Sequence, residues 1–264
     1  MLKLFKLLPA RVQRSLYFRF LWKFRARFKR LYDMAPLRLA PGVRMKLSHL
    51  DLYHGQIAFM GAYEEELSNL VLNLAACRGG LMIDVGANYG YFSLLWCAGN
   101  KKSRSTAIEA SPANLPALKL NLEMNGFSDR VEVLSWAASR AAGEACFDLG
   151  SSEETGWGGL SKDVAAGSIT VQTRRLDQEF SGRLVELLKI DCEGADFWVL
   201  EGAEGLLKSG LVKHVVFEEN IYRQEKLGIP EGEAVRLLTK NGYSCQQMGS
   251  DPWIKSYQAS LKTD

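Results

Sequence analysis

One short stretch of the chain combines an acid with two glycines at a spacing that suits ligand binding. Residues 81–90 read Leu-Met-Ile-Asp-Val-Gly-Ala-Asn-Tyr-Gly, so an apolar run reaches Asp84 and then turns through Gly86 and Gly90. Because glycine lacks a Cβ atom, the backbone of such a turn can approach a bound molecule closely. A strand, a glycine turn and a helix in this order form ligand sites at the carboxyl ends of parallel strands.

The spacing of this turn narrows the chemistry of the ligand. It lacks the G-x-G-x-x-G of a dinucleotide pyrophosphate site and the G-K-[ST] of a triphosphate site. Asp84 could hold the turn through backbone N–H groups or meet an ammonium group. Asn88 could serve a left-handed turn or a ligand. An acid beside this turn suits a cofactor with hydroxyls and a positive charge, a description that fits S-adenosylmethionine.

Further acids follow three later strand-like runs. Glu109 comes where Rossmann-like folds place an acid that accepts hydrogen bonds from ribose hydroxyls. Asp191 and Glu193 lie between an apolar run and a helix pattern, and Glu218 ends another run. Beside one crevice, Asp191 and Glu193 could ligate a divalent cation or orient a substrate hydroxyl. Alternatively, they stabilise a helix N-terminus. Asp191, Glu193 and Glu218 are our candidate catalytic residues.

A sheet is needed to bring these acids together. Short apolar runs alternate with helix patterns, which predicts a parallel sheet covered on both faces. The predicted strands are Leu81–Val85, Thr106–Glu109, Val131–Trp136, Ile169–Thr173, Leu187–Asp191, Val215–Glu218 and Tyr243–Met248. The predicted helices are Tyr63–Ala76, Tyr91–Ala98, Pro112–Met124, Ala195–Leu207 and Glu231–Asn241. Residues 151–168 are rich in Gly and Ser and predict a functional loop.

Bulk composition fits an ordinary globular protein. The chain has 264 residues, 47% apolar and 24% charged, enough for one α/β domain with additional segments. Its five cysteines form no C-x-x-C pair, so neither a disulfide framework nor a zinc knuckle is expected, and a reducing cytoplasm is favoured. His54 and His214 are expected to be structural or at the surface.

The first 46 residues form a separate, strongly basic arm. They carry thirteen Lys or Arg and one acid, Asp33, whereas the rest of the chain is net negative. At helical spacing, one side of 11–32 holds Tyr17, Phe20, Leu21, Phe24, Phe28 and Leu31, and the other holds Arg19, Lys23, Arg27 and Arg30. No run approaches the roughly 18 apolar residues of a membrane span. We predict a basic amphipathic helix, then a connector over 33–46.

Three roles for this arm are open. Residues 1–32 could lie on an anionic membrane surface, which would place a cytoplasmic protein peripherally on the inner face of the membrane. Alternatively, the apolar side packs on the rest of the chain. Nucleic acid is disfavoured as a partner because no motif of a known binding module follows. We divide the chain into 1–46, the arm and connector, and 47–264, the catalytic domain.

Taken in order, several motifs resemble FkbM-type S-adenosylmethionine-dependent methyltransferases. They are G-A-Y-E-E-E-L (61–67), I-D-V-G-A-N-Y-G-Y-F-S (83–93), A-I-E-A-S-P (107–112), N-L-E-M-N-G (121–126), L-K-I-D-C-E-G-A-D (188–196) and V-F-E-E-N (216–220). The family's E-P and E-G-A-E elements are E-A-S-P and E-G-A-D here. The resemblance covers about 61–248 and leaves the arm outside.

The resemblance implies a Rossmann-like class I fold, a seven-stranded mostly parallel sheet with helices on both faces and a final antiparallel strand. It also implies S-adenosylmethionine as cofactor. The residues implied to bind it are Tyr63, Glu65, Asp84, Gly86, Ala87, Asn88, Gly90, Glu109, Ala137 and Ala138. Ala137 and Ala138 would lie near the adenine.

The expected function is methylation of a hydroxyl on a sugar, glycolipid or natural product. The alternative is a catalytically silent binding protein of the same fold held at a membrane surface. A nicotinamide oxidoreductase is disfavoured because the third glycine at dinucleotide spacing is missing.

Overall fold

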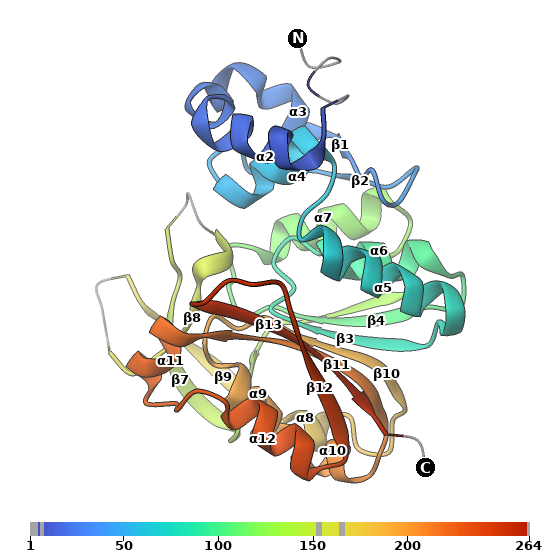
Figure 1. The fold of residues 1–264 in the computed structure, drawn as a ribbon, viewed down its shortest axis with the longest axis vertical. Helices are drawn as coiled ribbons and strands as arrows, with labels where there is room; N and C mark the ends of the chain where they lie inside the picture. The colour runs from blue at the N-terminus through green and yellow to red at the C-terminus, as the bar shows by residue number, and fades with distance from the viewer. Residues whose placement is uncertain (1–4, 6–7, 152–154, 164–166, 263–264) are drawn as a thin grey trace.

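The computed structural model describes residues 5, 8–151, 155–163 and 167–262. Its centre is a seven-stranded sheet with the strand order β12-β13-β11-β10-β3-β4-β5 (Figure 1). The strands are β3 (Leu81–Val85), β4 (Arg104–Ile108), β5 (Val131–Leu134), β10 (Val185–Ile190), β11 (Val212–Asn220), β12 (Tyr243–Met248) and β13 (Ile254–Leu261). Strand β13 runs antiparallel to both of its neighbours, and the pairs from β11 to β5 are parallel. The predicted α/β class and mostly parallel seven-stranded sheet are confirmed.

Side chains along each central strand alternate between two cores. On β3, Met82 faces one cluster and Ile83 the other, and Leu187 and Leu188 of β10 divide in the same way. The first face is covered by α5 (Glu65–Arg78), α6 (Tyr91–Gly99) and α7 (Leu115–Met124). The second is covered by α8 (Leu176–Glu179), α9 (Asp196–Gly202), α10 (Glu204–Lys208) and α12 (Glu233–Lys240). Helices therefore cover both faces, as predicted (Figure 1).

One predicted strand belongs to a different sheet. Residues 169–173 lie in β9 (Ile169–Arg174), which joins β6 (Ala137–Ala138), β7 (Gly143–Asp148) and β8 (Gly159–Ser161) in a four-stranded sheet. The seventh strand of the central sheet is β13 instead, which the strand pattern did not predict. Its sequence is largely polar, and Ala259 is its one buried residue, so β13 carries little of the apolar signal of a central strand.

The predicted helices exist, with changed boundaries. The first predicted helix begins and ends two residues later than expected, and the fifth begins two residues later and ends one residue earlier. The fourth, Ala195–Leu207, divides into α9 and α10 at Ala203. Helix α7 begins at Leu115, and Pro116 occupies its first turn instead of Pro112. Helices α4 (Leu52–Met60) and α11 (Ile221–Leu227) were not predicted.

The basic arm is not one helix. It consists of α2 (Ala10–Arg19), the 3₁₀ segment η1 (Leu21–Phe28) and α3 (Lys29–Asp33), followed by the short pair β1 (Ala35–Pro36) and β2 (Arg44–Met45). The helix breaks at Phe20, whose φ is −130°. A 3₁₀ helix has three residues per turn, so Trp22 and Phe28, six residues apart, lie on the same side of it. The apolar face that a 3.6-residue period predicted is therefore divided.

Part of the arm packs on the rest of the chain. Tyr17 and Tyr32 are fully buried, and the Tyr17 hydroxyl donates to the carbonyl of Leu52 in α4 at 2.7 Å. Rings of Tyr17, Phe28 and Tyr32 surround Phe59 of the same helix. By contrast, Phe20 and Phe24 were predicted on the same side as Tyr17 but are 56% and 47% exposed. None of the helices in the described ranges is long and apolar enough to span a membrane.

Candidate active site

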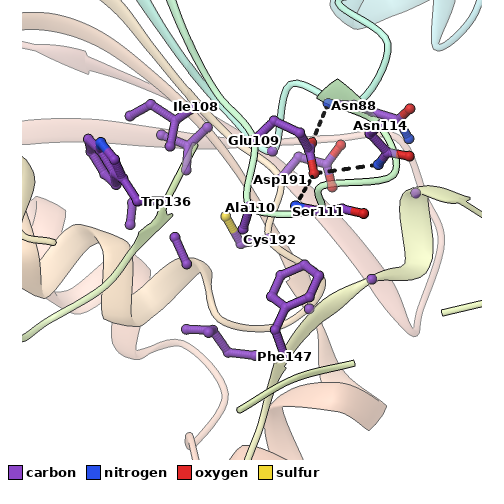
Figure 2. Close-up of a pocket in the computed structure, with 18 of the residues that line it drawn as sticks. Asn88, Ile108, Glu109, Ala110, Ser111, Asn114, Trp136, Phe147, Asp191 and Cys192 are labelled. Atoms are coloured by element: carbon purple, nitrogen blue, oxygen red, sulfur yellow. Dashed lines mark hydrogen bonds between the residues drawn. The ribbon is translucent and has the colours of Figure 1, made fainter. Parts of the chain in front are cut away.

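A pocket opens at the carboxyl ends of β3, β4 and β10. Figure 2 shows it between Glu109, Asn88 and Asp191 on one side and Ile108, Trp136 and Phe147 on the other. Its remaining lining comes from the turn after β4, from β6 and from a segment around the 3₁₀ turn η2 (Thr155–Trp157). The crevice thus lies where the topology of an open parallel sheet places a ligand.

The glycine turn adopts the conformation that its sequence predicted. Gly86, Asn88 and Gly90 have φ angles of 74°, 49° and 87°. A Cβ atom at Gly86 would collide with the backbone carbonyl of Asp191, which follows the neighbouring strand. The tight packing of these two strand ends therefore requires glycine at position 86. Gly86 and Asn88 line the pocket, whereas the buried Ala87 and Gly90 support the turn behind it.

Glu109 is the buried acid on the polar side of the pocket. Its carboxylate accepts from the backbone N–H of Asn88 at 2.7 Å and of Ser111 at 2.8 Å, and from the Asn114 amide at 3.4 Å (Figure 2). Burial raises the pKa of Glu109, and these hydrogen bonds oppose the shift. A carboxylate has about four acceptor positions, so a ligand hydroxyl can still bind. Glu109 lines the pocket, and its contact with a ribose stays a prediction.

The opposite side of the pocket is apolar and flat. Ile108, Trp136 and Phe147 line it together with Ala137 and Ala138. The two alanines, predicted to lie near an adenine ring, have side chains small enough to leave the slot open. An aromatic ring system can stack in such a slot while its polar substituents reach Glu109.

Lys189 is a buried cation beneath the glycine turn. Parallel pairing sets it beside Asp84 in the sheet, and its Nζ atom lies 3.4 Å from Asp84 Oδ1 and 3.3 Å from Asp191 Oδ2. The ammonium also donates to the Gly86 carbonyl at 3.3 Å, and Ser93 donates to Asp84 at 2.8 Å. Asp84 is thus fully buried and paired within the protein. Its side chain is not among the lining residues of the pocket.

The candidate catalytic acids lie close together at the crevice. Asp191 lines the pocket and is more accessible than Asp84, the other carboxylate paired with Lys189, with a side chain 32% exposed. Glu193 lies in a left-handed turn at φ 51°, where it accepts from the Asn220 amide and faces Arg223. Burial and the charge of Asp191 raise the pKa values of Glu193, to about 8, and of Glu218. Neither Glu193 nor Glu218 lines the described pocket.

The residue beside Tyr63 that faces these acids is Glu64. Burial among surrounding groups and the charge of Asp191 raise its pKa to about 7, although the side chain is open to solvent in the crevice. Burial raises the pKa of Tyr63, and the charges of Glu64 and Asp191 raise it further. Glu65, the predicted cofactor residue, forms an ion pair with Arg38 at 2.8 Å on the exposed surface. The structure therefore places Tyr63 and Glu64, and not Glu65, near these acids, and none of the three lines the described pocket.

These raised pKa values predict a loss of stability at alkaline pH. Glu193 and Asp196 hold protons to pH about 8 and about 7 in the folded chain, well above their values of 4.5 and 3.8 when unfolded. The folded state binds more protons in this range, so the free energy of unfolding should fall from pH 7 to 8.5. Chemical denaturation across this range should show the decline, and Glu193→Gln should make it shallower. A Glu123→Gln control, on the exposed side of α7, should keep the full slope; a slope unchanged by Glu193→Gln would contradict this origin.

A segment around η2 closes over the pocket and is fixed on two sides. Asp51 caps α4 with one carboxylate oxygen, and its other oxygen accepts from the Thr155 backbone N–H at 2.7 Å and hydroxyl at 2.8 Å. Arg223 of α11 donates to the Trp157 carbonyl at 2.7 Å. We call residues 155–161 the lid. It lies in the predicted functional loop, of which 152–154 and 164–166 are outside the described residues.

No metal site is evident in the described residues, where no group of three or more His, Cys, Asp or Glu side chains is arranged to hold an ion. The divalent cation that the acids suggested is therefore not supported. His54 accepts from the Ser48 N–H at 3.3 Å and packs against Tyr89 with the two rings tilted, and His214 forms a hydrogen bond with Ser260. Neither histidine lines the pocket, as expected.

Residues 84–245 of the chain match the methyltransferase FkbM domain, which is more than half of its length. The chain belongs to the FkbM methyltransferase family. Membership confirms the resemblance carried by the glycine turn and the 188–196 motif, and it implies the use of S-adenosylmethionine. The methyltransferase match includes every pocket residue, whereas Asp51 and the arm lie outside it.

Comparison with other proteins gives distant similarities. No curated protein matches the chain. Among solved structures, a methyltransferase FkbM from Methylobacillus flagellatus KT aligns at 16% identity with a TM-score of 0.49, over 69% of this chain and 43% of that one. This chain thus spans less than half of that protein. A precorrin-6y C5,15-methyltransferase from Geobacter metallireducens GS-15 aligns at 14% identity with a TM-score of 0.46, over 75% and 88% of the two chains.

Proposed function

We propose that this protein transfers a methyl group from S-adenosylmethionine to a hydroxyl oxygen of a small acceptor, such as a sugar, a glycolipid or a natural product. The observation that carries the proposal is the pairing of a buried acceptor carboxylate, Glu109, with a flat apolar slot on the other side of one pocket. Asp191, which lines the pocket and is partly exposed, offers a carboxylate to a cationic group of the ligand.

The residues of the pocket fit this cofactor. Glu109 has the remaining acceptor capacity for a ribose hydroxyl, and the slot beside Ala137 and Ala138 fits an adenine ring. Asp191, next to the glycine turn, suits the ammonium group of the amino-acid end. When bound, S-adenosylmethionine supplies an activated methyl group on a sulfonium.

The acceptor hydroxyl needs a base at the same crevice. A carboxylate whose pKa lies near 7 accepts a proton more readily than an ordinary one and is still about half ionised at neutral pH. Glu64 has such a pKa, and Glu218 is shifted in the same direction. We assign proton removal to this group of acids. The lid is held beside the pocket by its bonds to Asp51 and Arg223 and so limits the access of water to the reacting groups.

The cofactor assignment is tested by isothermal titration with S-adenosylmethionine and, separately, with NAD. The protein should bind the first and not the second. Glu109→Gln should weaken binding about tenfold or more, because hydrogen bonds to a charged group are worth about 1.5–3 kcal/mol. Glu123→Gln, a matched change on the exposed side of α7, should leave the dissociation constant unchanged. Binding of NAD instead, or no binding to folded protein, would refute the cofactor assignment.

Transfer itself is tested with methyl-labelled S-adenosylmethionine and a panel of hydroxylated acceptors. Label recovered as a methyl ether supports the proposal, and the rate should rise with an apparent pKa near 7 that disappears in Glu64→Gln. Tight cofactor binding with no transfer to any acceptor class would favour the silent binding protein.

A further inference from the structure

The outward side of the arm combines exposed apolar side chains with basic ones. Phe18, Phe20 and Phe24 are 36%, 56% and 47% exposed, and Val12 is 42% exposed. From this surface we propose that the arm binds the face of an anionic phospholipid membrane. We call Val12, Phe18, Phe20 and Phe24, with the basic residues named below, the arm surface.

The charge of the arm surface is nearly all positive. Its exposed basic residues are Arg11, Arg14, Arg19, Lys23, Arg27, Lys29 and Arg30, and Asp33 is the one acid between 8 and 33. Within the described part of the chain, no carboxylate forms an ion pair with any of these seven. A positively charged surface of this kind is attracted by the negative surface potential of a membrane that contains acidic lipids.

The apolar groups give the arm surface a second means of attachment. The guanidinium groups of Arg14 and Arg27 lie over the rings of Phe18 and Phe24, with 5.9 and 5.4 Å to the ring centroids. Each pair therefore presents an aromatic ring together with a cation over its face, which matches the boundary between acyl chains and headgroup phosphates. Nucleic acid would use the cations but not the exposed Val12.

The arm has a rigid base for this contact. Because Tyr17, Phe28 and Tyr32 pack around Phe59 of α4, the exposed rings do not have to enter the core to complete it. Asp51, which caps the N-terminus of α4, also binds the lid. The arm surface is therefore connected through α4 and Asp51 to the lid beside the pocket. This arrangement suits an acceptor embedded in the membrane. Only this last step rests on the proposed function.

The experiment is cosedimentation of the full chain with vesicles. Vesicles of phosphatidylcholine with phosphatidylglycerol should retain the protein at low salt, and pure phosphatidylcholine should not. The bound fraction should fall severalfold at high salt because screening weakens surface charges. Combined Phe18→Ser, Phe20→Ser and Phe24→Ser should lower the affinity about tenfold. A Tyr222→Ser, Trp253→Ser control, which removes rings 62% and 68% exposed outside the arm, should not.

Several results would overturn the proposal. One is a triple variant that binds anionic vesicles with wild-type affinity. Another is a control variant that loses as much vesicle affinity as the triple variant, and a third is a protein that binds neutral and anionic vesicles equally well. Tighter binding to single-stranded DNA than to anionic vesicles at the same salt would replace the membrane with nucleic acid as partner. Titration with S-adenosylmethionine in the triple variant separates this outcome from failure of the proposed function, because cofactor affinity should not change.

Discussion

Gly86→Ala is expected to destabilise the protein by about 4 kcal/mol or more, which is a large share of the free energy of unfolding of an average domain. The left-handed φ of 74° would cost an alanine about 1–2 kcal/mol. The larger part comes from the collision of the new Cβ with the Asp191 carbonyl. That carbonyl cannot move away easily, because the Asp191 N–H donates a hydrogen bond to the Val85 carbonyl and holds the two strand ends together.

Gly126→Ala separates the two contributions. Gly126 has a similar φ of 66°, but a Cβ there would meet no atom within 4 Å. It should lose only the conformational part, about 1–2 kcal/mol. Urea denaturation of both variants measures the difference. Equal losses in the two variants would show that the close approach of β3 and β10 is relaxed in solution.

Lys189→Met should cost about 3–5 kcal/mol, the range seen when one partner of a buried ion pair is removed. The methionine would fill nearly the same space, so the loss reports charge and not volume. Asp84 would keep Ser93 as its hydrogen-bond donor but would have no cation, and Asp191 would lose the same neighbour. Lys119→Met, at an exposed position on α7, should change stability by less than about 0.5 kcal/mol.

The double variant Asp84→Asn, Lys189→Met tests the cause of this loss. Removing the buried charge should return much of the stability lost in Lys189→Met, so the two changes should be strongly non-additive in denaturant unfolding. The cost of Lys189→Met alone should also shrink at acid pH, because protonation removes the charge that lacks a partner. Additive losses, independent of pH, would mean that Lys189 acts through packing.

Local patterns were sufficient to predict the central frame of the site. The apolar run, Asp84 and the two glycines specify a strand and its turn within ten residues, and Glu109 follows at the next strand end. These features depend on backbone conformation and side-chain type close in sequence. For that reason the pocket side formed by Gly86, Asn88 and Glu109 agrees with the prediction.

Other features depend on contacts that no local pattern contains. The partner of Lys189 is set by the register of β10 against β3, although a lysine between Leu188 and Ile190 signals that a buried partner exists. The choice between Glu64 and Glu65 is made by one left-handed residue, Glu64, at φ 41°. The bond between Asp51 and Thr155 joins residues 104 positions apart. A pattern of 3.6-residue period also could not reveal the 3₁₀ segment in the arm.

The position of β13 has a consequence for the order in which the sheet can form. Strand β12 hydrogen-bonds within the sheet to β13, and β13 in turn joins it to β11. During synthesis, β12 leaves the ribosome before the strand that must lie between it and the other strands. It therefore waits unpaired until Ile254–Leu261 has emerged. A chain that stopped before Ile254 would lose two strands from the sheet and not one.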